Sequence, residues 1–390
     1  MQVVAHEFET KTASAAPAES GRQASFSCPG LLALADGTVI TGAVSGGAIA
    51  AEGELVFTTA TTGWGEILSD PSYAGQIVVL THPMAGNYRI RREELESARI
   101  HARGLVVSRL VDPPPGPGLS LTDLLIEGGI PVIAGVDTRA LTLALRNGAV
   151  RRAVIAPADE GEIAAVARAS ESVAWDAVDH VASVATRERF VVPPVGRLRA
   201  RAVLVDYGVK RSLLAALALR GIEITALPPS ATLADVRACA PDLVVLSPGP
   251  GDPSRMAGHI ATVGALAADA VAGGPPILGI CLGHQLLALA AGGRTRRLTV
   301  GHHGGNHAVL ECATGRVDIG AHNHEVEVVD DPALAAAGYA VSHRDLNDGT
   351  VEGLSHLSGR IVSVQFHPEG APGPIDASRI FDLALERALA

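Results

Sequence analysis

Aromatic residues and lysines are scarce in this chain of 390 residues. Aromatic side chains make up 3% of the sequence and hydrophobic residues 47%, so any core must be built from Ala, Val, Leu and Ile. Lysine occurs only at Lys11 and Lys210, a bias that we attribute to a GC-rich genome rather than to function. The formal charge of −10, with no basic run, argues against a nucleic-acid-binding surface.

The sequence also lacks the signatures of secretion and membrane insertion. Its four cysteines are scattered and form no CxxC pair, which fits a reducing compartment better than a disulfide framework. No apolar run approaches the length of a membrane helix, and the chain does not open with a basic segment followed by an apolar one. We therefore expect a cytoplasmic protein that has no membrane partner.

Length and composition predict two domains. Residues 1–27 are rich in Ala, Ser, Glu and Thr and are expected to form a disordered tail. Residues 28–192 open with short β-type runs, which predict a β-rich domain. After a proline-containing linker at 193–199, residues 200–390 alternate apolar strands with helices. That alternation is typical of a doubly wound, mostly parallel α/β sheet.

Hydrophobic periodicity and capping residues place the individual elements. In the first domain, strands are expected at residues 30–35, 38–42, 54–59 and 76–81, helices at 120–127, 137–148 and 159–170, and an irregular proline-rich loop at 112–118. In the second, strands are expected at 202–205, 223–226, 243–246, 277–280 and 361–366, and helices at 212–220, 259–272 and 286–291.

The most informative segment is residues 276–285, where an apolar β-type run ends in a Gly-x-Cys-x-Gly sequence centred on Cys281. This is the pattern of a nucleophile elbow with sulfur in place of a serine oxygen. The glycines permit a sharp turn, and the free N–H groups of the following helix favour a thiolate. Small buried cysteines are also common in cores, so the assignment of a nucleophile depends on its partners.

A strand pattern near the C-terminus supplies two such partners. It runs into His367-Pro368-Glu369, where the proline keeps His367 extended at the strand end. Glu369 can then fix the tautomer of the imidazole, so that nucleophile, base and carboxylate follow in the order Cys281, His367 and Glu369. A lone His-Pro-Glu is more often a surface turn, but together with the elbow it favours a catalytic triad.

A Gly/Pro-rich loop at residues 247–253 follows a buried strand. The carboxyl ends of strands in an open α/β sheet face the site crevice. The backbone N–H groups of Gly249, Gly251 and Leu282 are therefore candidates for an oxyanion hole. An ordinary tight turn is the alternative explanation for this loop taken alone.

These three elements resemble the triad-type (class I) glutamine amidotransferases over residues 202–390. Four further motifs resemble the carbamoyl-phosphate synthetase small subunit: TTGWGEILSDPSY at 61–73, GNY at 86–88, VDTRALT at 136–142 and GHHGGNH at 301–307. The resemblance covers nearly everything after the tail. It implies a glutaminase subunit that passes ammonia to a large subunit for ATP- and bicarbonate-dependent carbamoyl phosphate synthesis, which serves pyrimidine and arginine biosynthesis.

The resemblance also implies residue roles. Cys281 would attack glutamine, His367 would protonate the departing ammonia and then activate water, and Glu369 would orient the imidazole. The residues expected to hold the substrate are Ser72, Gly249, Gly251, Leu282, Gln285, Asn323, Glu325 and Val326. No cofactor is expected in this chain, because it has no G-x-x-x-x-G-K-[ST] loop. ATP and its metal ions would belong to the large subunit of a heterodimer.

The sequence departs from the family pattern at Glu325 and Val326, where a glycine and an aromatic residue are usual. A carboxylate beside an anionic substrate is expected to weaken binding, although a contact made by main-chain atoms would survive. The loop at 112–118 replaces a Ser-Asn-x-Arg-like element, and the linker at 193–199 is short. Both changes bear on the docking of the large subunit.

Five histidines invite a test for a zinc site: His302, His303, His307, His322 and His324. No carboxylate or cysteine lies beside them at ligand spacing, and the neighbouring glycines indicate a close-packed loop. We therefore expect no metal site.

Two other functions remain open from the sequence. A stand-alone γ-glutamyl hydrolase or cysteine peptidase uses the same elbow and triad, although it has no need of the motifs at 61–73 and 136–142. A catalytically weak scaffolding paralogue would retain the fold. The intact triad argues against that paralogue, and the change at Glu325 keeps it as an alternative.

Overall fold

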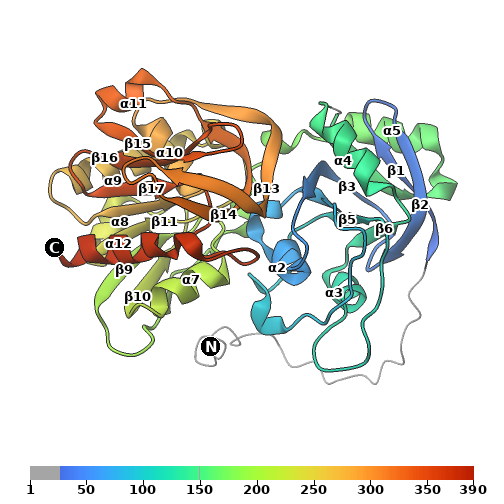
Figure 1. The fold of residues 1–390 in the computed structure, drawn as a ribbon, viewed down its shortest axis with the longest axis horizontal. Coiled ribbons are helices and arrows are strands. Elements are labelled where there is room, and N and C mark those ends of the chain that lie inside the picture. The colour runs from blue at the N-terminus through green and yellow to red at the C-terminus, as the bar shows by residue number, and fades with distance from the viewer. Residues whose placement is uncertain (1–26, 149) are drawn as a thin grey trace.

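Seven strands of the first half close into a barrel in a computed structural model that describes residues 27–148 and 150–390. They are β1 (Cys28–Leu34), β2 (Val39–Gly46), β3 (Ala51–Thr58), β4 (Gln76–Leu80), β5 (Gly104–Val107), β6 (Pro131–Ala134) and β7 (Arg152–Pro157). The barrel order is β1-β2-β6-β5-β4-β3-β7, and the barrel occupies the right of Figure 1. The tail predicted at 1–27 lies, except for its last residue, outside the described residues.

Short helices of the first half lie beside the barrel, except the last, whose Val181 packs against β-strand residues of the second half. Side-chain caps mark the starts of two of these helices. The helices are α2 (Trp64–Ser69), α3 (Leu121–Gly128), α4 (Thr138–Arg146), α5 (Glu162–Glu171) and α6 (Val181–Val184). Ser120 and Asp137 cap α3 and α4 as predicted, each accepting a backbone N–H three residues on. Helix α5 begins later than predicted, because Gly161, with a φ of 84°, separates it from a 3₁₀ turn at Ala158–Glu160.

A ten-stranded sheet organises the second half. Its strands, in spatial order, are β14 (Val317–Val328), β13 (Thr295–Glu311), β15 (Tyr339–Asp345), β16 (Val351–His356), β17 (Ile361–Val364), β12 (Ile277–Ile280), β11 (Leu243–Leu246), β9 (Ala200–Val205), β10 (Ile222–Leu227) and β8 (Phe190–Val192). The strands from β17 to β10 run parallel, and the flanks are antiparallel. The chain thus contains the predicted α/β core, extended by an antiparallel flank.

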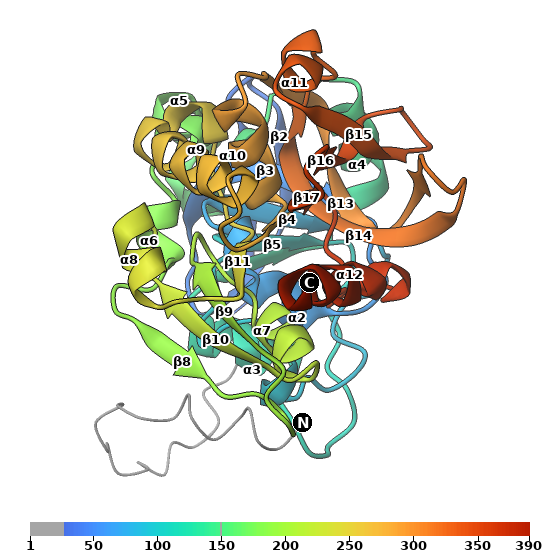
Figure 2. The ribbon, with the colours of Figure 1, turned by 90° about the vertical axis from the view of Figure 1, so that its left-hand side faces the viewer.

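Helices cover both faces of the parallel core, as Figure 2 shows. Helices α7 (Arg211–Ala218) and α12 (Arg379–Leu389) lie on one face, α8 (Leu233–Ala238), α9 (Ala257–Val271) and α10 (Leu282–Ala290) lie on the other, and α11 (Pro332–Ala336) lies beside β15. Among the described residues, no helix combines the length and the apolar character needed to cross a bilayer.

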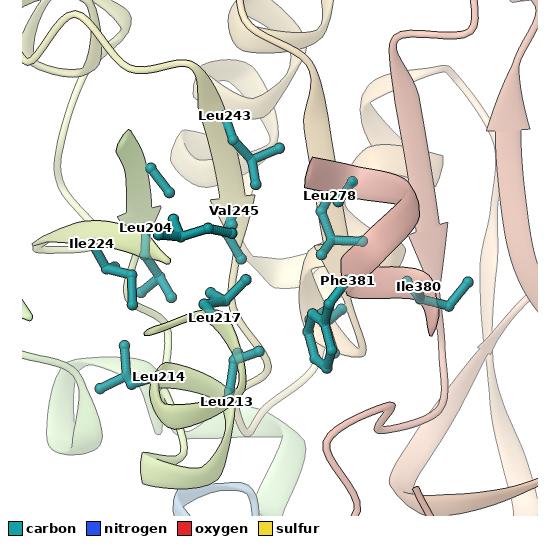
Figure 3. Packing of buried hydrophobic residues seen from close by; sticks show 14 of the residues in the cluster. Leu204, Leu213, Leu214, Leu217, Ile224, Leu243, Val245, Leu278, Ile380 and Phe381 are labelled. Carbon is teal, nitrogen blue, oxygen red and sulfur yellow. The ribbon is translucent and has the colours of Figure 1, made fainter. Parts of the chain in front are cut away.

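Alternate residues of the central strands supply the two cores. Val245 and Leu278 pack with Phe381 of α12 on one face, in the cluster drawn in Figure 3. Their neighbours Val244 and Ile277 belong to the cluster on the opposite face. Because successive side chains of a strand point to opposite sides, burial of both faces requires the continuous apolar runs seen in the sequence.

The largest departure from the predicted elements is the long hairpin of β13 and β14. The segment at 301–307 was expected to be a close-packed loop, but it lies within β13 and pairs with β14. Register shifts between Arg297 and His302 and between Gly304 and His307 accommodate the irregular stretch. A strand rich in histidine and glycine lacks the alternation of apolar residues by which strands are recognised, so periodicity did not reveal it.

Candidate active site

Cys281 occupies the turn between β12 and α10, at the carboxyl end of a central parallel strand. Its backbone has φ 52° and ψ −104°, a conformation that costs a residue with a side chain about 1–3 kcal/mol. The N–H group of Cys281 donates to the carbonyl oxygen of Val364 at 2.8 Å, which ties the turn to β17. The predicted strand, turn and helix are therefore present, with the thiol at the start of α10.

Close packing explains the glycines on either side of the crevice. A Cβ atom at Gly283 would lie 2.7 Å from the Cβ of Leu246, and nearer still to its carbonyl oxygen. A Cβ atom at Gly249 would lie 2.8 Å from the carbonyl carbon of Tyr207. Only glycine lets the elbow sit against β11 and lets the loop after β11 approach the next strand end.

His367 lies beside the elbow because β17 and β14 hold it there. Strand β17 ends at Val364, earlier than predicted, and the N–H of His367 then donates to the carbonyl of Ala321 in β14 at 2.8 Å. Nδ1 of His367 lies 2.7 Å from Oε1 of Glu369. The opposite ring atom, Nε2, has no partner at hydrogen-bond distance. The side chain of Cys281 is nevertheless close enough to His367 to favour the protonated imidazole and so to raise its pKa.

Lys210 completes this buried charged group. Its Nζ atom lies 3.3 Å from Oε1 of Glu369 and donates to the carbonyl of Gly370 at 3.0 Å. Burial opposes ionisation of Glu369, but Lys210 and His367 outweigh it and lower the pKa of Glu369 to about 2. Burial also opposes protonation of His367, but Glu369 outweighs it and raises the pKa of His367 to about 10. At neutral pH all three side chains are therefore charged.

A small cavity lies beside Cys281. The predicted site residues that line it are Ser72, Gly249, Gly251, Cys281, Gln285, Asn323, Glu325 and Val326. His367 lines an adjacent cavity together with Lys210 and Asn323. Leu282 is buried at the first position of α10. The structure therefore brings residues of the barrel and of the sheet to one place.

Ser72 presents a free hydroxyl group to this cavity. Asp70 holds the backbone of Ser72 by accepting its N–H at 2.9 Å, and Asn323 of β14 donates to the other carboxylate oxygen of Asp70 at 3.0 Å. The Oγ atom of Ser72 is buried and has no hydrogen-bond partner. Since an unpaired buried hydroxyl is costly, this atom is well placed to bond a ligand.

Gln285 forms hydrogen bonds with residues that surround the sulfur of Cys281. Its side-chain N–H groups donate to the carbonyl of Val326 at 2.7 Å and to Oε1 of Gln365 at 3.0 Å. Gln365 in turn donates to the sulfur of Cys281 at 3.6 Å, and the thiol lies 3.8 Å from the carbonyl oxygen of Asn323. Helix α10, β14 and the end of β17 are thereby joined around one atom.

Glu325 lies in a network of opposite charges that joins the two halves of the chain. Arg151, next to β7 of the barrel, contacts both Glu325 and Glu54. Arg297 contacts Glu54 and lies 3.9 Å from Glu325, and Nε2 of His303 lies 2.7 Å from it. Burial opposes ionisation of Glu325, but His303 and the two arginines outweigh it and lower its pKa to about 2. The negative charge expected to oppose the substrate is therefore balanced by its neighbours.

No carboxylate lies beside the histidines at ligand spacing along the chain, but two carboxylates lie near them in space. Glu352 of β16 and Asp345 of β15 lie among the histidines of β13 and β14. Both acids are distant in the sequence from the histidine segments. Strand pairing brings them together, so ligand spacing along the chain did not reveal them.

Several residues that shape the site were not predicted: Asp70, Lys210, His303 as a partner of Glu325, and Gln365. Asp70 carried a signal, because it lies within the motif at 61–73. Lys210 also carried one, since it is one of two lysines in the chain. Gln365 carried none, because its contacts are made between separate elements.

Two family models and several relatives match this chain. The model described as glutamine amidotransferase class-I matches residues 203–386, and the carbamoyl-phosphate synthase small chain, CPSase domain, matches residues 32–155. Carbamoyl phosphate synthase small chains from Bacillus caldolyticus and Symbiobacterium thermophilum are each 41% identical to it, over 91% and 90% of this chain. The one from Listeria innocua is 40% identical over 91%. Each alignment covers 96% of the relative.

Among solved structures, a glutamine amidotransferase from Thermotoga maritima aligns with 19% identity and a TM-score of 0.35. The alignment covers 44% of this chain and 76% of that one. The family assignment follows from the relatives, whose alignments run through both halves of the chain. The chain therefore belongs to the carbamoyl phosphate synthase small chain family and is an enzyme with a class I glutamine amidotransferase domain.

Proposed function

We propose that this chain is the glutaminase subunit of a cytoplasmic carbamoyl phosphate synthase. It would hydrolyse L-glutamine through a thioester on Cys281 and pass the ammonia to a large-subunit partner. The observation that carries the proposal is the strained Cys281 in one buried group with His367 and Glu369. This group borders a cavity lined by both halves of the chain. ATP and its metal ions would act on the large subunit.

In the first half of the reaction, the thiolate sulfur of Cys281 attacks the side-chain amide carbon of glutamine. The carbonyl electrons move onto oxygen, which the backbone N–H groups of Leu282 and Gly249 stabilise. When the tetrahedral intermediate collapses, the C–N bond breaks and His367 gives its Nε2 proton to the departing ammonia. The ring is already protonated at neutral pH, so this step needs no further acid.

In the second half, water replaces ammonia. Neutral His367 takes a proton from the water, whose oxygen attacks the thioester carbon. Breaking the C–S bond releases glutamate and returns Cys281 and His367 to their starting state. Glu369 keeps a proton on Nδ1 throughout by accepting its hydrogen bond at 2.7 Å.

Substrate binding would use groups from both halves. The unpaired hydroxyl of Ser72 comes from the barrel, and Gly251, Gln285, Asn323 and Val326 come from the sheet domain. A pocket of this kind loses a wall when the halves separate. This arrangement and the match of residues 32–155 to the small-chain domain favour the subunit over a stand-alone hydrolase.

The decisive experiment compares glutamine hydrolysis by the wild type and by Cys281→Ala, each alone and with the large subunit. We expect slow hydrolysis by the wild type alone, stimulation by the partner, and a loss in the variant of at least about 10³-fold, as for other nucleophiles. Cys239→Ala is the matched control, because Cys239 is half-buried and lies outside the cavity. Equal residual activity in wild type and Cys281→Ala would contradict the catalytic assignment.

A further inference from the structure

Three histidines and a glutamate face one another beside the part of β14 that carries Asn323. They are His302 of β13, His322 and His324 of β14, and Glu352 of β16. One ligand atom from each lies within 4.8 Å of all the others. Their side chains are between 0% and 9% exposed, so water does not explain the arrangement.

The hydrogen bonds at the outer side of this group define the tautomers. Nδ1 of His324 lies 3.0 Å from the carbonyl oxygen of Val326, which only accepts. Nε2 of His302 lies 2.9 Å from a carboxylate oxygen of Asp348. Each of these ring atoms must therefore carry the hydrogen. The other nitrogen of a neutral His324 ring is then a bare lone pair. His302 differs, because the carboxylates of Glu352 and Asp348 outweigh its burial and raise its pKa to about 9.

The inner nitrogens of both rings face the carboxylate of Glu352. Nε2 of His324 and Nδ1 of His302 have no hydrogen-bond partner, and each lies 3.8 Å from Oε1 of Glu352. Nε2 of His322 lies 2.9 Å from Oε2 of the same carboxylate, a hydrogen bond in which the ring donates. Buried polar atoms that lack a partner are costly. A cation at the centre would satisfy the unpartnered nitrogens of His302 and His324 and would replace the hydrogen that His322 donates.

We propose that His302, His322, His324 and Glu352 bind a zinc ion. Imidazole nitrogens with one carboxylate suit Zn²⁺, whereas Mg²⁺ and Ca²⁺ prefer oxygen ligands. Zinc–ligand bonds of about 2.0–2.1 Å in a tetrahedral site place neighbouring ligand atoms about 3.3 Å apart. The distances to the carboxylate oxygens of Glu352 are 2.9 Å from His322 and 3.8 Å from His302 and His324, on either side of this value, and the four ligand atoms all lie within 4.8 Å of one another.

The contacts outside the four ligands fit the same assignment. Histidine ligands of metals usually donate their second N–H to a carboxylate or a backbone carbonyl. Asp348 and the carbonyl of Val326 provide these acceptors. A second possible set replaces His324 and Glu352 with His307 and Asp345. It is less suited, because the side chain of His307 is 17% exposed, whereas those of the four proposed ligands are at most 9% exposed.

The ion would be structural. Four protein ligands close a zinc site and leave no position for a substrate. The ligands come from β13, β14 and β16, so the ion would tie the hairpin to the neighbouring strands. Asn323 lies between His322 and His324 on β14, with its side chain on the cavity side. Loss of the ion is therefore expected to loosen the strand that carries Asn323.

The test measures metal in the untagged full-length protein, because a histidine tag would itself bind zinc. We expect about one zinc per chain by elemental analysis. Removal with a chelator should lower the melting temperature, and added zinc should restore it. Cobalt added to the stripped protein should produce the visible absorption of a tetrahedral site.

Variants then identify the ligands. His322→Gln and Glu352→Gln should each lose the bound zinc and the cobalt absorption. His307→Gln, in the same region, and His343→Gln, a buried histidine of β15 outside the proposed set, should keep both. The zinc and cobalt measurements on the wild type do not depend on any variant, so the proposal can still be tested if a variant misfolds.

Three results would overturn the proposal. The first is wild-type protein that carries no metal and gains neither absorption from cobalt nor stability from zinc. The second is retention of one zinc per chain by His322→Gln and Glu352→Gln. The third is loss of the ion in His307→Gln, which would assign the other set. None of these results depends on glutamine hydrolysis, so the zinc site is tested independently of the proposed activity.

Discussion

His367 is subject to opposing influences on its charge. Burial opposes the imidazolium, Glu369 favours it from 2.7 Å away, and Lys210, which contacts the same carboxylate oxygen, opposes it. The carboxylate prevails and raises the pKa of His367 to about 10. The charge that makes His367 a proton donor thus depends on one acidic side chain.

Replacing Glu369 with glutamine should lower the pKa of His367, because the ammonium of Lys210 would remain without its partner. The alkaline limb of kcat/KM for glutamine hydrolysis reports loss of the imidazolium in the free enzyme. We expect this limb to move down by roughly 1–3 pH units, the usual effect of one close opposite charge. Full pH profiles of wild type and Glu369→Gln measure the shift.

The control for this profile is Glu386→Gln, which removes an exposed carboxylate of α12. It should keep the wild-type alkaline limb. An unmoved limb in Glu369→Gln would show that the carboxylate does not set the protonation of the imidazole.

The β12–α10 turn depends on close contact between elements. Gly283 lies in the first turn of α10 against β11, and its missing side chain lets the helix start directly under the loop after that strand. The rigid backbone of Leu246 leaves no room for adjustment. Helix α9 packs beside α10 and contains Gly264, which has room for a side chain. A Cβ atom at Gly264 would contact only the Cβ of Ala290, at 3.7 Å.

These two glycines give a matched pair of substitutions. Gly283→Ala should destabilise the protein by about 1–3 kcal/mol through overpacking, and should reduce glutamine hydrolysis because the elbow must move. Gly264→Ala should stabilise it by about 0.5–1 kcal/mol, since alanine is the better helix residue and the space exists. Thermal melting compares the two. Equal melting temperatures would contradict the packing argument.

At the scale of the whole molecule, polar contacts join the barrel to the sheet domain. Asp70 bonds Asn323, and Arg151 bridges Glu54 of the barrel and Glu325 of β14. The walls of the cavity come from both halves. These contacts therefore couple the stability of the interface to the shape of the site.

Glu325 gives this coupling a pH dependence. Its pKa falls from 4.5 to about 2 in the folded protein, because His303 and the arginines outweigh its burial. Its contribution to stability is therefore complete above pH 4.5 and is lost as the pH falls toward 2. Glu325→Gln should reduce stability at neutral pH by about 1–3 kcal/mol, because Arg151 and His303 lose a charged partner while Arg151 and Arg297 keep Glu54. Urea unfolding of wild type and variant between pH 7 and pH 2 measures both the pH dependence of the stability and its loss in Glu325→Gln.

Below pH 4.5 the difference between Glu325→Gln and wild type should shrink, because the wild type loses the same contribution. Glu93→Gln, at an exposed site of the barrel domain, should keep the wild-type dependence. A constant difference across the acid range would contradict the assigned charge of Glu325.

Local signals in the sequence predicted much of the fold. Ser120 and Asp137 mark helix starts because caps act within three residues, and the strands at 243–246 and 277–280 are apolar because both faces are covered. The β13–β14 hairpin was missed, because its histidines and glycines serve contacts on both faces rather than an apolar pattern. Pairing across strands, unlike capping, leaves no short-range signature.

The sequence by itself determined the elbow at Cys281, the order of Cys281, His367 and Glu369, and the family, because each is carried by a continuous run of residues. Only the tertiary structure decided that Lys210 neutralises Glu369 and that Arg151 neutralises Glu325. It alone placed a glutamate of β16 among three histidines. Charge balance acts through space over a few ångströms, and strand pairing brings into that range residues that the chain keeps far apart.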